Sequence, residues 1–202
     1  CQVTAGTNAT LGETIRAVQV HFQSGSVRLR HGQDPDVEFV GLWDADGAAL
    51  RYEDLYQPIA RMDLSFVCPD PFGRHVDGPF SVFLGATAAA IPCGTAPCTG
   101  IVTISDATNP VLTYKNILGD TVASMTLTIT HTAGQDSTTI DLDTRAITLS
   151  DNGVLSNGYA EFTSGSFFSV SALDDGDYNG ANWPTLAVSS GSAVFTYDKR
   201  YL

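Results

Sequence analysis

The chain has 202 residues, of which 43% are hydrophobic, and its 22 acidic and 10 basic residues give a formal net charge of −12. This length suits one large domain or two small ones, and no apolar run is long enough to span a membrane. Because nucleic-acid binding depends on Lys and Arg that neutralise phosphates, the charge argues against specific binding to DNA or RNA. It suits either a wall along which DNA slides or simple solubility.

Asp occurs 18 times and Glu only four times. Asp is a poor helix former that favours turns and strand ends. Together with the abundance of Thr, Val, Ser and Gly, this choice of acid predicts an all-β fold.

The first half of the sequence predicts strands joined by tight turns. Two alternating stretches, IRAVQVHF and SVRLRH, flank Gly25, which allows a positive φ in a hairpin turn. Asp46-Gly47 marks a second turn of this kind. The predicted elements are hairpins over Thr14–Arg30 and Val37–Tyr52, a helical turn at Glu53–Gln57, and strands at Arg61–Cys68 and Gly78–Leu84.

A domain boundary is expected within Ala86–Pro97, which is rich in small residues and proline. Seven short strands and a hairpin are predicted beyond it, a number and spacing typical of an antiparallel sandwich. We therefore predict two β-sandwich or split-barrel domains, residues 1–95 and 96–202. The strands are expected at Gly100–Ser105, Val111–Lys115, Val122–Thr130, the hairpin within Ser137–Asn152, Gly158–Thr163, Ser166–Ser171, Thr185–Ser189 and Ala193–Tyr197.

The clearest hairpin lies within Ser137–Asn152. Apolar residues alternate with polar ones on both sides of Asp143-Thr144-Arg145, which suits a tight connection. A period of two residues is typical of strands with one buried face and one solvated face. The residues expected in the core are Ile140, Leu142, Ile147 and Leu149.

The cysteines allow three interpretations. Cys93 and Cys98 form a close pair, and with Cys68 and His75 they would complete a tetrahedral zinc set. The C-x4-C spacing is looser than the usual C-x2-C, and a disulfide within the pair would require an oxidising environment. We expect free thiols, with Cys68 in a core, and no zinc or other cofactor.

One loop resembles the first half of a calcium-binding EF-hand. Asp175, Asp177, Asn179 and Gly180 match D-x-D-x-N-G, in which alternating oxygen ligands and a sharp bend suit a hard cation. Position twelve, however, is Leu186 instead of a bidentate Glu. An acidic turn without calcium is therefore expected.

The sequence contains no nucleophile elbow, zinc-protease motif or phosphate-binding glycine loop. Asp141 and Asp143 project from one face of a strand, as a glycosidase pair would, but Asp is so common here that coincidence explains them. We expect a protein without enzymatic activity.

The aromatic residues are candidates for a sugar-binding surface or for a protein interface. Phe167 and Phe168 are adjacent, so in a regular strand they face opposite ways. One is then expected in the core, and the other is expected to be covered by a neighbouring domain or subunit. Trp43, Trp183, Tyr159 and Tyr178 are further candidates for contact with sugar, although packing is the simpler role.

Several short motifs lie along the chain from about residue 60 to its end. They are FVCPDPFGR (Phe66–Arg74), NPVLTYKN (Asn109–Asn116), the I-D-x-x-x-R-x-I hairpin (Ile140–Ile147), Asn152-Gly153, the aromatic stretch Gly165–Val170 and the final strand Ala193–Leu202. Together these motifs resemble the distal tail proteins of long-tailed bacteriophages, over about residues 60–202 and most clearly 109–202. One departure stands out, because the usual L-x-P-G-x-N loop is replaced by Ala172–Asn179, which is longer and has no proline.

This resemblance implies a first domain that forms a hexameric ring between tail tube and hub, and a second, galectin-like domain of the jelly-roll type that carries receptor-binding parts. The implied partners are further copies of the chain, the tail tube protein, and hub and tape-measure-associated proteins at the tail tip of the virion. Basic residues concentrate in the first half, and Arg28, Arg30 and Arg61 are candidate interface residues. Solvated strand faces are the alternative for these arginines.

The competing function is a carbohydrate-binding module or a bacterial surface lipoprotein domain. The second of these is suggested by Cys1, since a mature bacterial lipoprotein begins with a lipidated cysteine. Either of these proteins would be a monomer with exposed aromatic rings in a groove.

Overall fold

The computed structural model describes residues 2–4, 13, 17, 20, 25–31, 34–54, 59–172 and 183–202. The named elements are strands apart from one 3₁₀ helix, η1 (Tyr159–Glu161), which confirms the all-β class. Within the described ranges, no helix has the length and apolar character needed to cross a membrane. The chain divides into two compact units, Cys1–Gly73 and Arg74–Leu202.

The division between the units lies earlier in the chain than the predicted boundary near residue 95. Strand β6 (Phe80–Leu84) pairs with β16 (Ser192–Tyr197), and β7 (Ala89–Ala90) pairs with β15 (Thr185–Val188). Residues 74–95 are therefore hydrogen-bonded into the second unit. The proline-rich stretch that suggested a linker is instead a crossover between two sheets of that unit.

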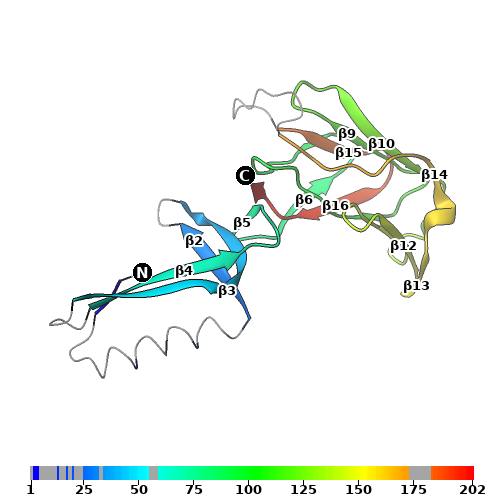
Figure 1. Ribbon diagram of the computed structural model, residues 1–202. Helices are drawn as coiled ribbons and strands as arrows, with labels where there is room; N and C mark the ends of the chain where they lie inside the picture. Colours follow the sequence, from blue (N-terminus) through cyan, green and yellow to red (C-terminus); the bar gives the residue numbers. More distant parts are fainter. Residues whose placement is uncertain are drawn as a thin grey trace. The chain divides into compact units, whose positions relative to one another are not determined.

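The first unit is built on an antiparallel sheet. β4 (Ile59–Val67) lies between β1 (Gln2–Thr4) and β3 (Asp34–Asp54), and β2 (Ser26–His31) pairs with β3. Figure 1 draws these strands in blue and cyan.

Two predictions for the first unit are wrong. The expected hairpin turn at Asp46-Gly47 is an irregularity within the single long strand β3, where the register against β4 shifts between Asp44 and Ala49. β4 pairs with β3 on both sides of this shift, so the chain continues without reversing. Glu53, expected in a helical turn, also lies in β3, and residues 55–57 lie outside the described residues.

The hairpin predicted over Thr14–Arg30 is also corrected. Strand β2 pairs with β3, which follows it. Within residues 14–22 only Ala17 and Val20 are described, and both are helical. The apolar residues of this segment are also spaced by three and four positions, a pattern that a helix satisfies as well as a strand.

The second unit is a sandwich of two antiparallel sheets (Figure 1). The strand order is β14-β10-β9-β15-β7 in one sheet and β13-β12-β11-β8-β16-β6 in the other. Two short strands, β5 (Gly73–His75) and β17 (Arg200–Tyr201), are hydrogen-bonded to each other. The remaining bounds are β8 Gly100–Ser105, β9 Val111–Lys115, β10 Thr121–Leu127, β11 Ser137–Asp141, β12 Ala146–Asp151, β13 Val154–Asn157 and β14 Phe162–Gly165.

The predicted central hairpin is confirmed as β11 and β12. Ile140 and Ile147 are paired across the hairpin and are 0% and 2% exposed. Leu142 is buried and Leu149 is half-buried. In the connection Arg145 has a φ of +58°, the left-handed conformation that a tight turn needs. The alternation seen in the sequence therefore places one face of the hairpin in the sandwich core.

Two strands predicted later in the chain differ from the structure. The segment predicted as Gly158–Thr163 contains η1 and the start of β14, and the edge strand β13 precedes it. Ser166–Ser171 makes only an isolated bridge, between Val170 and Cys98. Because this segment is not a regular strand, the alternation expected of a strand does not apply to it.

Candidate functional site

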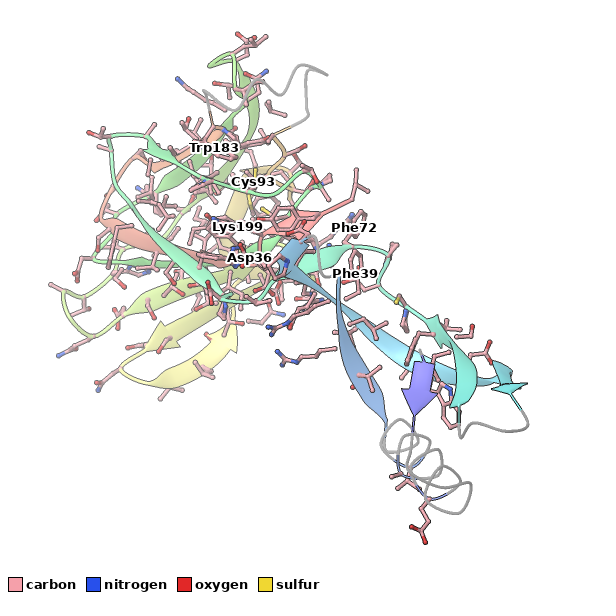
Figure 2. The ribbon with its side chains drawn as sticks, turned by 90° about the vertical axis from the view of Figure 1, so that its left-hand side faces the viewer. Asp36, Phe39, Phe72, Cys93, Trp183 and Lys199 are labelled. Carbon is pink, nitrogen blue, oxygen red and sulfur yellow. The ribbon has the colours of Figure 1, made fainter. Side chains whose placement is uncertain are left out.

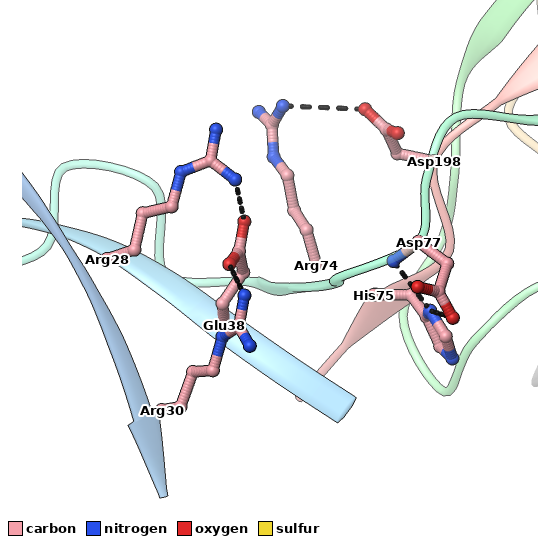
Figure 3. Close-up of polar contacts among 7 residues, drawn as sticks. All are labelled: Arg28, Arg30, Glu38, Arg74, His75, Asp77 and Asp198. Carbon is pink, nitrogen blue, oxygen red and sulfur yellow. Dashed lines mark hydrogen bonds and ion pairs between the residues drawn. The ribbon is translucent and has the colours of Figure 1, made fainter. Parts of the chain in front are cut away.

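A cluster of charged residues lies on β2 and β3 of the first unit. Arg28 and Arg30 both bind Glu38, with nitrogen–oxygen distances of 2.8 Å to Oε1 and 3.1 Å to Oε2 (Figure 3). The Glu38 side chain is only 9% exposed, whereas the two arginine side chains are 70% and 51% exposed. A buried carboxylate needs such compensation. The cluster therefore satisfies Glu38 and leaves one net positive charge at the surface.

The sequence pointed to both arginines but missed Glu38, which lies opposite Arg30 in the register of β2 and β3. Pairing SVRLRH with the strand after it would have placed these residues together. The side chain of Arg61, the third candidate, lies outside the described residues.

Phe167 and Phe168 both pack against the core of the second unit. The Phe168 ring stacks on Tyr114, with ring centroids 5.2 Å apart, and the Phe167 ring lies 5.9 Å from that of Phe162. Both rings are half-buried. The prediction that only one of them packs in the core is wrong, because both rings pack against it.

The proposed zinc residues lie in different parts of the fold. Cys68 belongs to the first unit, and His75, Cys93 and Cys98 belong to the second. The three described cysteines are free thiols, and Cys93 and Cys98 are buried. Figure 2 shows Cys93 among the side chains of its unit. Within the described ranges, no three His, Cys, Asp or Glu side chains are grouped so that they could hold a metal ion.

The thiols of Cys93 and Cys98 interact with each other. The side-chain hydrogen bond with Cys93, followed by burial, raises the pKa of the Cys98 thiol. Metal ligation requires the thiolate form. A neutral, buried pair therefore suits packing better than metal binding. The calcium candidates Asp175, Asp177 and Asn179 lie outside the described residues.

The carboxylates considered for catalysis have structural roles. Asp141 Oδ1 accepts hydrogen bonds from the backbone N–H groups of Asp143 and Thr144, at 2.9 and 3.1 Å. Burial opposes ionisation, but the bonds from Thr144 and Asp143 outweigh it and hold the pKa of Asp141 below its usual range. Asp143 accepts a bond from Thr99 Oγ1 at 3.1 Å. Both aspartates therefore fix the hairpin turn and its surroundings.

An open hollow of about 350 Å³ lies beside this turn and includes both aspartates. Arg74 and Asp198, which line this hollow, form an ion pair at 3.5 Å (Figure 3). Ile101, which is 43% exposed, also lines it. The hollow lacks the ring that a sugar platform needs. Trp183, another candidate ring, packs against the core instead.

His131 is half-buried and is the centre of a hydrogen-bond network that the sequence did not reveal. Its Nδ1 accepts a bond from the backbone N–H of Ala107 at 3.2 Å, and its Nε2 lies 2.9 Å from Thr138 Oγ1. Nδ1 therefore carries no proton, and Nε2–H donates to the hydroxyl. Burial lowers the pKa of His131, while Asp136 and Asp106 act in the opposite direction.

Comparison with known proteins gives one informative similarity. No family model matches the sequence, and no curated protein matches it. Among solved structures, the chain is similar to Dit (gp 19.1) of phage SPP1, with a TM-score of 0.68 and 12% sequence identity. The match covers 100% of this chain and 76% of that protein.

The chain has the fold of SPP1 Dit. That protein is described as a paradigm of the hub adsorption apparatus in phages that infect Gram-positive bacteria. The predicted resemblance to distal tail proteins is thus confirmed at the level of fold. It extends over both units and not only over residues 60–202, where the sequence motifs lie.

Proposed function

We propose that the chain is a structural component of a phage tail tip, a distal tail protein of the virion. The observation that carries this proposal is the similarity of fold to SPP1 Dit along the entire chain. A similarity limited to the second unit would suggest only a common sandwich, a fold that hosts many functions.

Two further features support a structural role. The carboxylates that a glycosidase would use are engaged in turn-forming hydrogen bonds. Two of the aromatic side chains that a sugar-binding module would expose, Trp183 and Phe168, pack against the core, whereas Tyr159 is 46% exposed. The proposed role is therefore assembly, with no catalytic turnover and no cofactor.

In finer detail, copies of the chain form a ring, with six members, that joins the tail tube to the hub. The first unit forms the ring, and the second unit projects from it and presents receptor-binding parts. The net charge of −12 suits a ring around a DNA path, because like charges keep the DNA from adhering to the wall.

Gold-labelled antibodies test the proposal on particles produced from the genome that encodes the chain. The label is expected at one end of the tail. Label on the surface of bacterial cells, with unlabelled particles, would instead support the surface lipoprotein alternative.

A further inference from the structure

Cys93 and Cys98 place two thiols in contact inside the core of the second unit. The two residues are 3% and 0% exposed and belong to one hydrophobic cluster. A side-chain hydrogen bond joins their thiols, and only four residues separate them in the sequence. Figure 2 labels Cys93 among the side chains of this core. The proposed assembly role does not explain why two thiols, and not two aliphatic side chains, meet here.

The backbone holds both cysteines in place. The N–H of Cys98 donates to the carbonyl oxygen of Val170, and the N–H of Val170 donates to that of Cys98, each at 2.8 Å. The N–H of Cys93 donates to the carbonyl oxygen of Ile91, also at 2.8 Å. Two groups that a fold holds in contact react with each other far faster than with molecules in solution. The pair is therefore placed to react as a unit.

We propose that Cys93 and Cys98 are a modification site, at which the two thiols join in a disulfide when the protein leaves a reducing environment. The inference goes beyond the proposed function and does not depend on it. Cytosolic thiols are kept reduced, whereas secreted proteins and proteins on virion or cell surfaces meet oxidising conditions. The dithiol of the structure is the reduced form, and a small-molecule disulfide is the oxidant.

The disulfide forms by a two-step exchange. A thiolate of the pair attacks the small-molecule disulfide, which gives a mixed disulfide and one small-molecule thiol. The other thiolate attacks the protein sulfur of that bond and releases the second small-molecule thiol. Two cysteine S–H bonds are thus replaced by one S–S bond, and the two protons and two electrons end on the released thiols.

The surroundings of the pair make this reaction slow. The hydrogen bond with Cys93, followed by burial, raises the pKa of the Cys98 thiol and keeps the reactive thiolate scarce. Oxidation therefore requires local opening of the loop between the two cysteines. The pair stays reduced during brief exposure to an oxidant and becomes linked when the exposure is long or the exchange is catalysed.

The loop between the cysteines also holds the end of the described chain. The N–H of Ala96 donates to the carbonyl oxygen of Arg200 at 3.0 Å, and the N–H of Leu202 donates to Thr95 Oγ1 at 3.1 Å. A disulfide would close a short ring that contains both Thr95 and Ala96. Because a disulfide restricts the unfolded chain, the linked form should hold these last residues in place more firmly.

The test equilibrates the full chain in glutathione buffers that range from fully reduced to fully oxidised, with protein disulfide isomerase as catalyst. Samples are quenched with acid, unfolded, alkylated and digested, and the peptides are identified by mass spectrometry. We expect a peptide in which Cys93 is linked to Cys98, lighter by two hydrogen atoms than its reduced form. This link is detected in the natural chain, so the result stands even if a variant does not fold.

Two serine variants show whether the effect belongs to the pair. Urea unfolding of the oxidised natural chain should give an unfolding equilibrium constant at least about tenfold lower than that of the reduced chain. Cys93→Ser should show no such difference between the buffers. The matched control is Cys68→Ser, which changes a half-buried cysteine of the first unit and should respond to oxidation like the natural chain. Exchange of the Ala96 amide hydrogen should also slow in the oxidised natural chain.

Three outcomes would overturn the inference. The first is that both thiols are still alkylated after equilibration in the most oxidising buffer. The second is a stable mixed disulfide with glutathione, or a link from either cysteine to Cys1 or Cys68. The third is a link that forms only in urea, because the native geometry would then exclude the bond.

Discussion

Replacing His131 should reveal how the loops at one end of the second sandwich are held together. His131 receives a hydrogen bond from the backbone of Ala107 and donates one to Thr138, and both of these partners are 0% exposed. His131→Ala would leave a buried N–H and a buried hydroxyl without their partners. Each buried polar group left unsatisfied costs about 1–3 kcal/mol, so we expect a loss of about 2–4 kcal/mol in the free energy of unfolding.

The pH dependence follows from the same geometry. Protonation of Nδ1 removes the acceptor for Ala107, and the pKa of His131 in the folded chain lies below its ordinary value of 6.5. The unfolded chain therefore takes up the proton first as the pH falls. The stability contributed by neutral His131 is fully present above pH 6.5 and is lost as the pH falls from there through the folded-state pKa. Asp136 and Asp106 face the ring and limit the size of this loss.

His131→Asn separates the hydrogen bond from the titration, because an amide oxygen can accept from Ala107 and does not titrate. Urea unfolding at pH 7.5 and pH 5.5 gives the free energies to compare. The natural chain should lose more stability than His131→Asn between these pH values. Equal losses would refute the reasoning, since the remaining histidines are common to both proteins.

Three further predictions concern the second unit. Ile140→Ala should cost about 2–5 kcal/mol in unfolding free energy. Asp141→Asn should cost less than about 1 kcal/mol, because the amide oxygen still accepts the turn hydrogen bonds. Equal costs for the two variants would contradict the register of the hairpin. Gly94→Ala should cost at least about 1–3 kcal/mol in unfolding free energy, because its Cβ would overlap the backbone carbonyl oxygen of Arg200. Thermal melts compare it with the control Gly85→Ala, whose Cβ would meet no atom within 4 Å. The purified chain should release no reducing sugar from bacterial cell-wall glycans, and release that Asp141→Asn abolishes would show an enzyme.

The sequence was most informative where one face of a strand is buried and the other is solvated. Ile140 and Ile147 lie in the core as the alternation predicted, and Arg145 lies in the predicted turn. In the first unit the stretch VEFVGLW has apolar residues at both odd and even positions. Such a pattern cannot indicate which face is buried, and the exposure of Val40 and Leu42 was missed for this reason.

Contacts between residues far apart in the chain were the second feature that could not be predicted from the sequence. The domain boundary was misplaced because β6 and β7 pair with strands that follow more than 90 residues later. The partners of His131 lie 24 and seven residues away in the sequence, and no local pattern joins them. The role of Glu38 emerged only when β2 was aligned with β3.

The most direct test of the proposed function is a three-dimensional reconstruction of the tail tip from particles of the encoding phage. The account predicts copies of the second-unit sandwich, with its five-stranded and six-stranded sheets, arranged around the tail axis between tube and hub. Density at the tail tip into which neither unit fits, in particles that lack the chain by mass spectrometry, would contradict it.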